Sequence, residues 1–479
     1  MATNAQSKRS APPQQAGRLL LVSNRLPVTV SFNNGEIALT PSGGGLATGL
    51  RGVSQRMGSV WVGWPGEMPP GSKHRSELEH KLTRYGSQPV YLSRAEQKGF
   101  YEDFSNAAIW PVFHDLIDQL PLTIEGWPTY RHVNQKFAEA VASAYRPGDI
   151  IWVNDYHLMT APQLIREIIP DAKLGFFLHI PFPSPEIFGV LPARADLLRG
   201  LLGADLIGFH TRQFADSFIA SVESVLGART TPQSIRYGGR NVRVGVFPMG
   251  IDAAAWEERA RSTPVAKQVL ALMQDAGKRK IILGIDRLDY SKGMLRRIAA
   301  IEKLLQSDRK LADRVRFVQV SFPSRERIES YAGLRRQLNE TVGRINATYG
   351  SPRSLPIHLV QRSFPEDEVS ALYSAADIML VTPLRDGMNL VAKEFVASRL
   401  HGDGVLVLSE FAGAAAELKE ALIVNPYDTE GIATAIKTAI EMPRDQQRAR
   451  MSAMRRTVTE CDVNFWAQSF LGALADQGK

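Results

Sequence analysis

The chain has 479 residues, a hydrophobic content of 44% and a formal net charge of +8. That length exceeds what one hydrophobic core usually supports, so we expect more than one domain. The single cysteine, Cys461, excludes an intrachain disulfide and a zinc site of clustered thiolates, and it suits a cytoplasmic location. Basic residues cluster at 278–280, 296–297 and 444–456, but no nucleic-acid-binding motif accompanies them, so we do not expect nucleic acid as a partner. We also expect no membrane partner, because no apolar stretch is long enough to span a bilayer.

The first half of the chain alternates predicted strands with predicted helices. Residues 1–17 lack the apolar core of a signal peptide and are predicted to form a disordered tail. Strands are then expected at 19–24, 149–155, 173–179, 206–210 and 242–248, with helices such as 133–145 and 215–226 between them. Strands joined by helical crossovers form parallel sheets with helices on both faces.

The second half repeats this alternation. Strands are expected at 280–285, 316–322, 357–360, 378–382, 405–408 and 423–424, and the longest helix at 324–349. Pro248 and Gly250 interrupt regular structure between the halves. The pattern therefore predicts an α/β chain with two Rossmann-like domains joined near residue 250, followed by an amphipathic segment at 462–471.

A dinucleotide-dependent dehydrogenase is the natural rival for such a topology. It would carry Gly-x-Gly-x-x-Gly directly after the first strand. Here the first strand continues into Arg25, and the later Gly43-Gly44-Gly45 lacks the third glycine of that fingerprint. The glycine loop could still let the backbone approach a ligand closely.

The segment 382–394 joins a buried strand to a helix that begins near Asn389. Gly387 is expected to permit the tight turn, since it has no Cβ. The first N–H groups of a helix lack internal partners, and the positive end of the helix suits a phosphate or a developing anion. Asp386 could accept hydrogen bonds from sugar hydroxyls or act as an ordinary cap, and Glu394 could be a solvated helix residue.

Arg287 and Lys292 follow the predicted strand 280–285. In open α/β sheets, ligands bind at the carboxyl edge of the strands. Arginine offers a planar fork for phosphate oxygens, and lysine adds a compact charge. Together with the helix start near Asn389, the two cations predict a diphosphate pocket.

With these segments in place, the chain resembles the trehalose-6-phosphate synthases, a family of retaining glucosyltransferases of the GT-B fold. The matching segments follow the family's order between about Leu19 and Leu474, and they are 22–27, 43–46, 104–107, 110–111, 153–158, 178–188, 285–293 and 382–394. The resemblance implies two Rossmann-like domains facing a central cleft and a C-terminal helix that crosses back to the N-terminal domain. The expected units are a disordered tail (1–17), an acceptor domain (18–248), a nucleotide-sugar domain (249–455) and the crossing helix (456–479).

The resemblance also implies a reaction: glucose passes from UDP-glucose to glucose 6-phosphate, giving α,α-trehalose 6-phosphate and UDP, with no metal or other cofactor. The catalytic residues carried over from the family are Arg287, Lys292, Asp155 and His179. The donor-binding residues are Gly44, Gly45, Arg287, Lys292, Phe364, Asp386, Gly387, Met388, Asn389, Leu390, Val391 and Glu394. The acceptor-binding residues are Arg25, Tyr101, Trp110, Asp155 and Arg325.

Several alternatives stay open at the level of sequence. Tyr101 and Trp110 could be core aromatic residues, and His179 could be structural. The stretch 114–118 fits only some versions of the family, so another phosphorylated acceptor, such as glycerol 3-phosphate, is a second hypothesis. A pseudoglycosidic coupling enzyme and a non-catalytic sugar-phosphate-binding regulator are the others. The sequence leaves open the preferred nucleotide and whether the chain forms a homo-oligomer.

Overall fold

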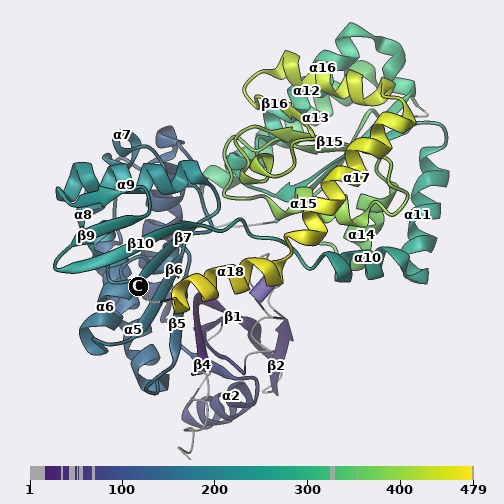
Figure 1. Ribbon diagram of the computed structural model, residues 1–479. Helices are drawn as coiled ribbons and strands as arrows, with labels where there is room; N and C mark the ends of the chain where they lie inside the picture. The colour runs from purple at the N-terminus through teal and green to yellow at the C-terminus, as the bar shows by residue number, and fades with distance from the viewer. Residues whose placement is uncertain are drawn as a thin grey trace, which may run out of the picture.

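The computed structural model describes residues 17–33, 36–41, 49–50, 52, 58–66, 71–323, 329–352 and 354–476. These residues form two α/β lobes, each built around one sheet (Figure 1). Within the described ranges, no helix combines the length and the apolarity needed to cross a membrane.

The sheet of the first lobe has ten strands in the order β4-β3-β1-β5-β6-β7-β10-β9-β8, with β2 paired to β1. The run from β4 to β10 is parallel, whereas β2, β8 and β9 pair antiparallel. The predicted strands correspond to β1, β5, β6, β7 and β10, and the other five were not predicted. The bounds are β1 Leu19–Asn33, β2 Glu36–Pro41, β3 Val60–Gly66, β4 Ser87–Pro89, β5 Ile150–Asn154, β6 Lys173–Phe177, β7 Leu206–Phe209, β8 Arg229–Thr231, β9 Ser234–Tyr237 and β10 Arg240–Val246.

Helices cover both faces of this sheet because its strands alternate their apolar side chains. Leu20 and Val22 of β1 belong to one buried cluster, and Leu19 and Leu21 belong to the other. The helices are α2 Ser72–Arg84, α3 Arg94–Glu96, the π-helix η1 Gln97–Ile109, α4 Trp110–Phe113, η2 Ile117–Gln119, α5 Trp127–Ala144, η3 Tyr156–Leu158, α6 Ala161–Ile168, α7 Pro185–Phe188, α8 Arg194–Leu201 and α9 Arg212–Leu226.

The sheet of the second lobe is parallel throughout, in the order β13-β12-β11-β14-β15-β16. All six strands predicted in the second half are present. Their continuous apolar runs follow from burial on both faces. The bounds are β11 Lys280–Arg287, β12 Val315–Phe322, β13 Ile357–Val360, β14 Ile378–Val381, β15 Val405–Ser409 and β16 Leu422–Val424.

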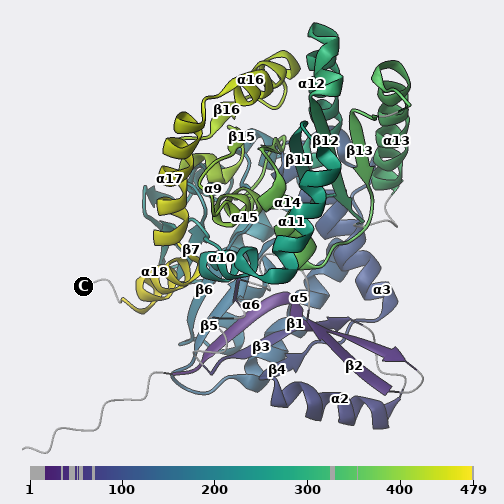
Figure 2. The same cartoon turned by 90° about the vertical axis from the view of Figure 1, so that its right-hand side faces the viewer.

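Helices flank this second sheet on both sides (Figure 2). Among the longer ones, α12, α13 and α16 contribute to one apolar cluster, and α14, α15 and α17 to the other. The bounds are α10 Ala253–Arg261, α11 Thr263–Ala276, η4 Tyr290–Lys292, α12 Met294–Ser307, η5 Arg309–Asp313, α13 Glu329–Tyr349, α14 Glu366–Ala375, α15 Leu390–Ser398, η6 Gly413–Ala416, α16 Thr429–Glu441 and α17 Arg444–Glu460.

The last helix, α18 (Val463–Ala475), packs on the sheet of the first lobe, as predicted (Figure 1). The rings of Trp466 and Phe470 lie 5.1 and 4.7 Å from the ring of Trp152 in β5. Gly175 and Gly208 make the approach possible, since a Cβ at either position would come within 2.8 Å of the Phe470 ring. The boundary predicted at residue 455 falls inside α17, and the chain leaves the second lobe after that helix ends.

The chain crosses between the lobes twice, and the two crossings touch. The amide of Val463 donates a hydrogen bond to the carbonyl oxygen of Ile251 at 3.0 Å. Met249 is held from both lobes, because its amide lies 3.4 Å from Nδ1 of His210 and its carbonyl oxygen accepts from Nζ of Lys393 at 2.8 Å.

Candidate functional site

The carboxyl edge of the second sheet brings together three of the predicted donor-binding residues. Nζ of Lys292 donates to Oδ2 of Asp386 at 2.6 Å, and Nδ2 of Asn389 donates to the same oxygen at 3.0 Å. Burial opposes ionisation of Asp386, but the Lys292 ammonium outweighs it, so the pKa of this carboxyl is lowered. The site therefore holds a partly buried carboxylate and a buried lysine side chain next to each other.

Helix α15 begins in this loop, and Asn389 rather than Gly387 supplies the left-handed backbone. Asn389 has φ 70° and is the N-cap of α15, a conformation that asparagine tolerates better than most residues. Its side-chain Oδ1 is buried and has no hydrogen-bond partner among the described residues. The role expected for Gly387 is thus corrected: its missing side chain matters for contact with the other lobe, as shown below.

Further along α15, Glu394 is partly buried against α14. Its carboxylate accepts a hydrogen bond from the Tyr373 hydroxyl at 2.9 Å. Burial raises the pKa of Glu394 to about 7, and the Tyr373 hydrogen bond offsets only part of that rise. Phe364 lies under a cation, since the Arg362 guanidinium sits 3.8 Å from its ring centroid.

Two of the predicted acceptor residues, Arg25 and Tyr101, lie in β1 and in the π-helix η1. The guanidinium of Arg25 lies 4.1 Å from the ring centroid of Trp64. Burial lowers the pKa of Arg25, and the nearby Tyr101 hydroxyl opposes that change. Tyr101, in η1, stacks in parallel on His157 with 5.6 Å between ring centroids. Arg25 and Tyr101 therefore converge in the first lobe.

Asp155 and His179 follow β5 and β6. Oδ1 of Asp155 accepts from the backbone amide of His179 at 3.2 Å, and Asp155 itself adopts a positive φ of 76°. Nε2 of His179 lies 3.1 Å from Oδ1 of Asn154. Burial, followed by the neighbouring His210, lowers the pKa of His179 well below its usual value, so the ring is neutral at pH 7.

Contacts between the lobes bring the two sets of residues together. The Arg287 guanidinium lies 5.7 Å from the ring centroid of Trp110, which begins α4. Gly387 packs so closely on the backbone of His179 that an added Cβ would overlap the His179 carbonyl oxygen. An ion pair between Arg385 and Asp115, with Nη1 and Oδ2 2.6 Å apart, also joins the lobes.

His114, which follows Trp110, was not assigned a role from the sequence. Its ring lies 4.0 Å from the Trp110 ring, and its Nδ1 donates to the Trp110 carbonyl oxygen at 2.7 Å. Burial lowers the pKa of His114 to about 4, with Asp289, Lys292 and Asp386 of the second lobe as the charges acting on it. A histidine four residues after Trp110, in the stretch 114–118 that fits only some versions of the family, was the signal that could have found it.

The remaining predicted residues divide into two groups. Met388 is buried beside Gly387, and Leu390 and Val391 form the first turn of α15. Gly44, Gly45 and Arg325 lie outside the described residues, so their placement stays a prediction.

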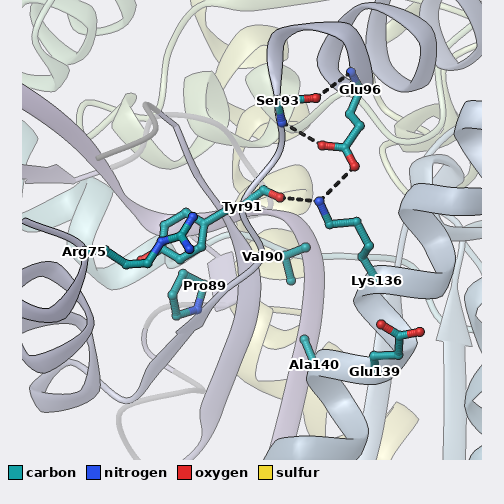
Figure 3. Close-up of a pocket in the computed structure, with 9 residues that line it drawn as sticks. All are labelled: Arg75, Pro89, Val90, Tyr91, Ser93, Glu96, Lys136, Glu139 and Ala140. Carbon is teal, nitrogen blue, oxygen red and sulfur yellow. Dashed lines mark hydrogen bonds and ion pairs between the residues drawn. The ribbon is translucent and has the colours of Figure 1, made fainter. Parts of the chain in front are cut away.

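A separate hollow of about 440 Å³ lies in the first lobe and contains none of the predicted residues (Figure 3). Nζ of Lys136, which lines the hollow, donates hydrogen bonds to the Tyr91 carbonyl oxygen at 2.6 Å and to Oε1 of Glu96 at 2.9 Å. The hollow is lined by Arg75, Pro89, Val90, Tyr91, Ser93, Glu96, Lys136, Glu139 and Ala140.

Comparison with known proteins defines the class to which this fold and site belong. The model of the family described as Glycosyltransferase family 20 matches residues 17–476. The chain belongs to this family, so the resemblance to trehalose-6-phosphate synthases and the assignment as an enzyme of that class are both confirmed.

Two sequence relatives show how far the similarity extends. A trehalose-6-phosphate synthase of Mycobacterium avium is 43% identical over 96% of this chain and 95% of its own length. A bifunctional trehalose-6-phosphate synthase/phosphatase of Thermoproteus tenax is 44% identical over 95% of this chain, which spans only 63% of that relative.

Solved structures extend the comparison to the fold. A UDP-forming α,α-trehalose-phosphate synthase from Burkholderia xenovorans, in complex with glucose-6-phosphate, has a TM-score of 0.87, is 33% identical, and matches over 96% of this chain and all of its own. An E. coli structure bound with UDP-2-fluoro glucose has a TM-score of 0.86, is 34% identical, and matches over 96% of this chain and 99% of its own. The predicted GT-B class is confirmed.

Proposed function

We propose that the chain transfers glucose from UDP-glucose to the anomeric hydroxyl of glucose 6-phosphate with retention of configuration, releasing UDP and α,α-trehalose 6-phosphate. The observation that carries this proposal is the convergence of Lys292, Asp386 and the start of α15 on a surface that contacts Trp110 and His179 of the other lobe. The E. coli and B. xenovorans relatives, which hold a UDP-glucose analogue and glucose-6-phosphate, support the two substrates.

The leaving group of this reaction is a nucleoside diphosphate, so stabilising its negative charge should supply a large part of the catalysis. Lys292 is suited to this task because its ammonium is buried and already fixed by Asp386 before any donor arrives. The Arg287 guanidinium and the free amides at the start of α15 would add donors on the same side. Positive groups held in place in advance do not have to reorganise as the charge develops.

The donor glucose and nucleotide are assigned to the loop before α15 and to the helix itself. The ionised Asp386 and the amides of Gly387 and Met388 would bind the hydroxyls of the glucose. Glu394 would accept from the ribose hydroxyls, with Phe364 beside the base. We assign the nucleotide-sugar domain to the second lobe on this basis, from residue 249 to the end of α17 at Glu460 rather than to residue 455.

The acceptor phosphate is assigned to Arg25 and Tyr101 of the first lobe and, from the sequence alone, to Arg325. Asp155 would bind the acceptor sugar, and the neutral His179 and Trp110 would shape the space between the two sugars. We assign the acceptor domain to residues 18–248. Retention would follow if the acceptor hydroxyl attacks on the face from which the phosphate departs and the leaving phosphate takes its proton. Closure of the lobes would then limit hydrolysis.

An assay of both products tests the proposed reaction. The purified chain is incubated with UDP-glucose and glucose 6-phosphate, UDP release is measured, and the disaccharide phosphate is examined by proton NMR for two α-anomeric signals. Parallel reactions replace the donor with ADP- or GDP-glucose and the acceptor with glycerol 3-phosphate. We expect UDP and α,α-trehalose 6-phosphate in equal amounts, with the UDP donor preferred.

The other outcomes identify the alternatives. Turnover with glycerol 3-phosphate but not with glucose 6-phosphate would replace the acceptor, and a β-configured product would reject retention. Binding of glucose 6-phosphate without release of UDP from any donor would indicate a regulator rather than a synthase.

The raised pKa of Glu394 predicts a pH-dependent affinity for the donor. An ionised carboxylate accepts hydrogen bonds from the ribose hydroxyls, whereas the protonated carboxyl group is a weaker acceptor. The donor KM should therefore fall as the pH rises through about 7 and Glu394 ionises. Donor kcat/KM is measured from pH 5.5 to 8.5 at saturating acceptor, together with calorimetry of UDP-glucose binding. Glu394→Gln should lower affinity about tenfold, as expected for loss of one charge-assisted hydrogen bond, and flatten the profile.

Glu302→Gln is the matched control for this profile. Glu302 pairs with Arg344 away from the site, and the pKa of its carboxyl is lowered, so it does not titrate in this range. An unchanged profile in Glu394→Gln would remove Glu394 from the donor site.

A further inference from the structure

A fully buried arginine, Arg297 of α12, lies directly behind the proposed donor pocket. Its Nη1 donates to Oδ2 of Asp286 at 2.7 Å, and its Nε donates to Oγ1 of Thr382 at 3.0 Å. Asp286 immediately precedes Arg287 at the end of β11, and Thr382 begins the loop that leads to Asp386. One guanidinium therefore joins the ends of two neighbouring strands.

Two more contacts extend this arrangement. Nη1 also donates to Oε1 of Gln319 in β12 at 3.1 Å, and Nη2 donates to the carbonyl oxygen of Lys292 at 3.3 Å. The sheet makes room for the group at Gly284, where a Cβ would lie 2.6 Å from both Nη1 and the Gln319 oxygen. Arg297 thus contacts every segment that carries a proposed diphosphate-binding group of this lobe.

A contribution to folding stability does not by itself explain why an arginine is buried at position 297. A buried ion pair is a poor stabiliser, because removing two charges from water offsets most of their attraction. A guanidinium group is planar and has five N–H donors, so it can fix the relative positions of the acceptors around it. Arg297 has no exposed surface, so it does not itself contact a substrate.

We propose that Arg297 is a positioning residue for the donor site, setting the relative placement of Arg287, of Lys292 and of the loop from Thr382 to Asn389. This inference rests on the proposed function, in which those groups bind the nucleotide sugar. The hydrogen bonds of Arg297 go to Asp286, Lys292, Gln319 and Thr382, all in the second lobe, so the affinity for the acceptor should be independent of it.

The test compares Arg297→Lys and Arg297→Met with the wild-type chain. We expect donor kcat/KM to fall about tenfold in Arg297→Lys and further in Arg297→Met, since small displacements of binding groups reduce rates strongly. The KM for glucose 6-phosphate should stay within twofold. Amide hydrogen exchange should rise in peptides covering 286–293 and 382–390, a readout that does not depend on which sugar nucleotide the enzyme uses.

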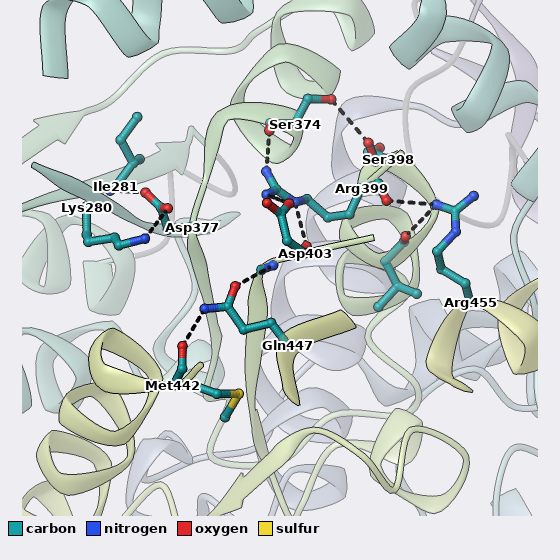
Figure 4. A network of polar contacts seen from close by, with 12 residues as sticks. Lys280, Ile281, Ser374, Asp377, Ser398, Arg399, Asp403, Met442, Gln447 and Arg455 are labelled. Atoms are coloured by element: carbon teal, nitrogen blue, oxygen red, sulfur yellow. Dashed lines mark hydrogen bonds and ion pairs between the residues drawn. The ribbon is translucent and has the colours of Figure 1, made fainter. Parts of the chain in front are cut away.

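Arg399→Met is the matched control. Arg399 is also a buried guanidinium of the second lobe, but it lies at the opposite edge of the sheet, where it donates to the carbonyl oxygens of Ser374 and Asp403 (Figure 4). We expect it to lower the melting temperature without changing donor kcat/KM or exchange at 286–293. If Arg297→Met behaves in the same way as this control, the positioning role is wrong.

A second variant covers the case in which Arg297→Met does not fold. Gly284→Ala keeps the charge but displaces the guanidinium, because the new methyl group would press on Nη1. It should reproduce the selective loss in donor kcat/KM, and wild-type donor kinetics in a folded Gly284→Ala protein would also overturn the inference. A wild-type chain inactive with every donor, but with exchange raised by Arg297→Met, would reject the proposed function and leave the positioning role standing.

Discussion

Arg287→Ala should lower kcat/KM for UDP-glucose by about 10²–10³-fold, the loss typical of removing one preorganised donor to a developing negative charge. The side chain is exposed at the end of β11 and lies against the Trp110 ring, so its removal opens no cavity in either core. The melting temperature should therefore change little, while calorimetry should show weaker binding of UDP.

Arg296→Ala provides the control for this prediction. Arg296 is also exposed and also contacts a ring, with its guanidinium 4.6 Å from the centroid of Tyr427 between β16 and α16, but it is not among the proposed substrate-binding residues. Its removal should leave both kinetic constants unchanged. Arg287→Lys should recover only part of the lost rate, because a point charge cannot replace the planar fork. If Arg287→Ala keeps more than a third of the wild-type kcat/KM, the diphosphate assignment fails.

Gly387→Ala should reduce kcat by roughly 10²-fold, as expected when reacting groups are displaced by about 1 Å. The added methyl group would overlap the His179 carbonyl oxygen and lie 3.0 Å from Cα of Ile180, so the donor loop would have to move away from the first lobe. Both substrates should still bind, because each binding surface belongs mainly to its own lobe.

The measurements are kcat, both KM values and the radius of gyration by X-ray scattering with UDP bound. Gly343→Ala in α13 is the control, since a Cβ there meets no atom within 4 Å and alanine favours a helix. It should leave turnover unchanged. A Gly387→Ala enzyme with normal kcat would show that the contact with His179 is not required for catalysis.

Sequence reasoning was most successful where the physics is local. Parallel strands bring their carboxyl ends to one edge, so the apolar runs before Arg287 and Thr382 were enough to predict that these two segments meet there. The helix start near Asn389 followed from the same local pattern. The sequence pattern could not reveal that Asn389 takes the left-handed conformation. Nor could it reveal that Gly387 allows the close approach of His179, because that approach depends on how the two lobes are arranged in the folded chain.

The features that the sequence did not predict depend on tertiary contacts. Arg296 and Arg297 look alike as a basic pair, yet one is exposed and the other has no accessible surface. The position of Arg297 on the apolar face of its helix, three residues after Met294 and four before Ile301, is the pattern that could have separated them. The π-helix η1 and the ion pair of Asp115 with Arg385 depend on partners that no local pattern identifies.

The packing of α18 has a consequence for how the protein is made. The residues that cover Trp152 and the neighbouring β6 and β7 belong to the last helix, so they leave the ribosome only after the whole second lobe has been synthesised. Until then one face of the earlier sheet keeps its aromatic side chains in water, which is the kind of surface that chaperones bind and that aggregates form from. A chain that terminates before Trp466 would keep that face uncovered permanently, even with every proposed substrate-binding residue present.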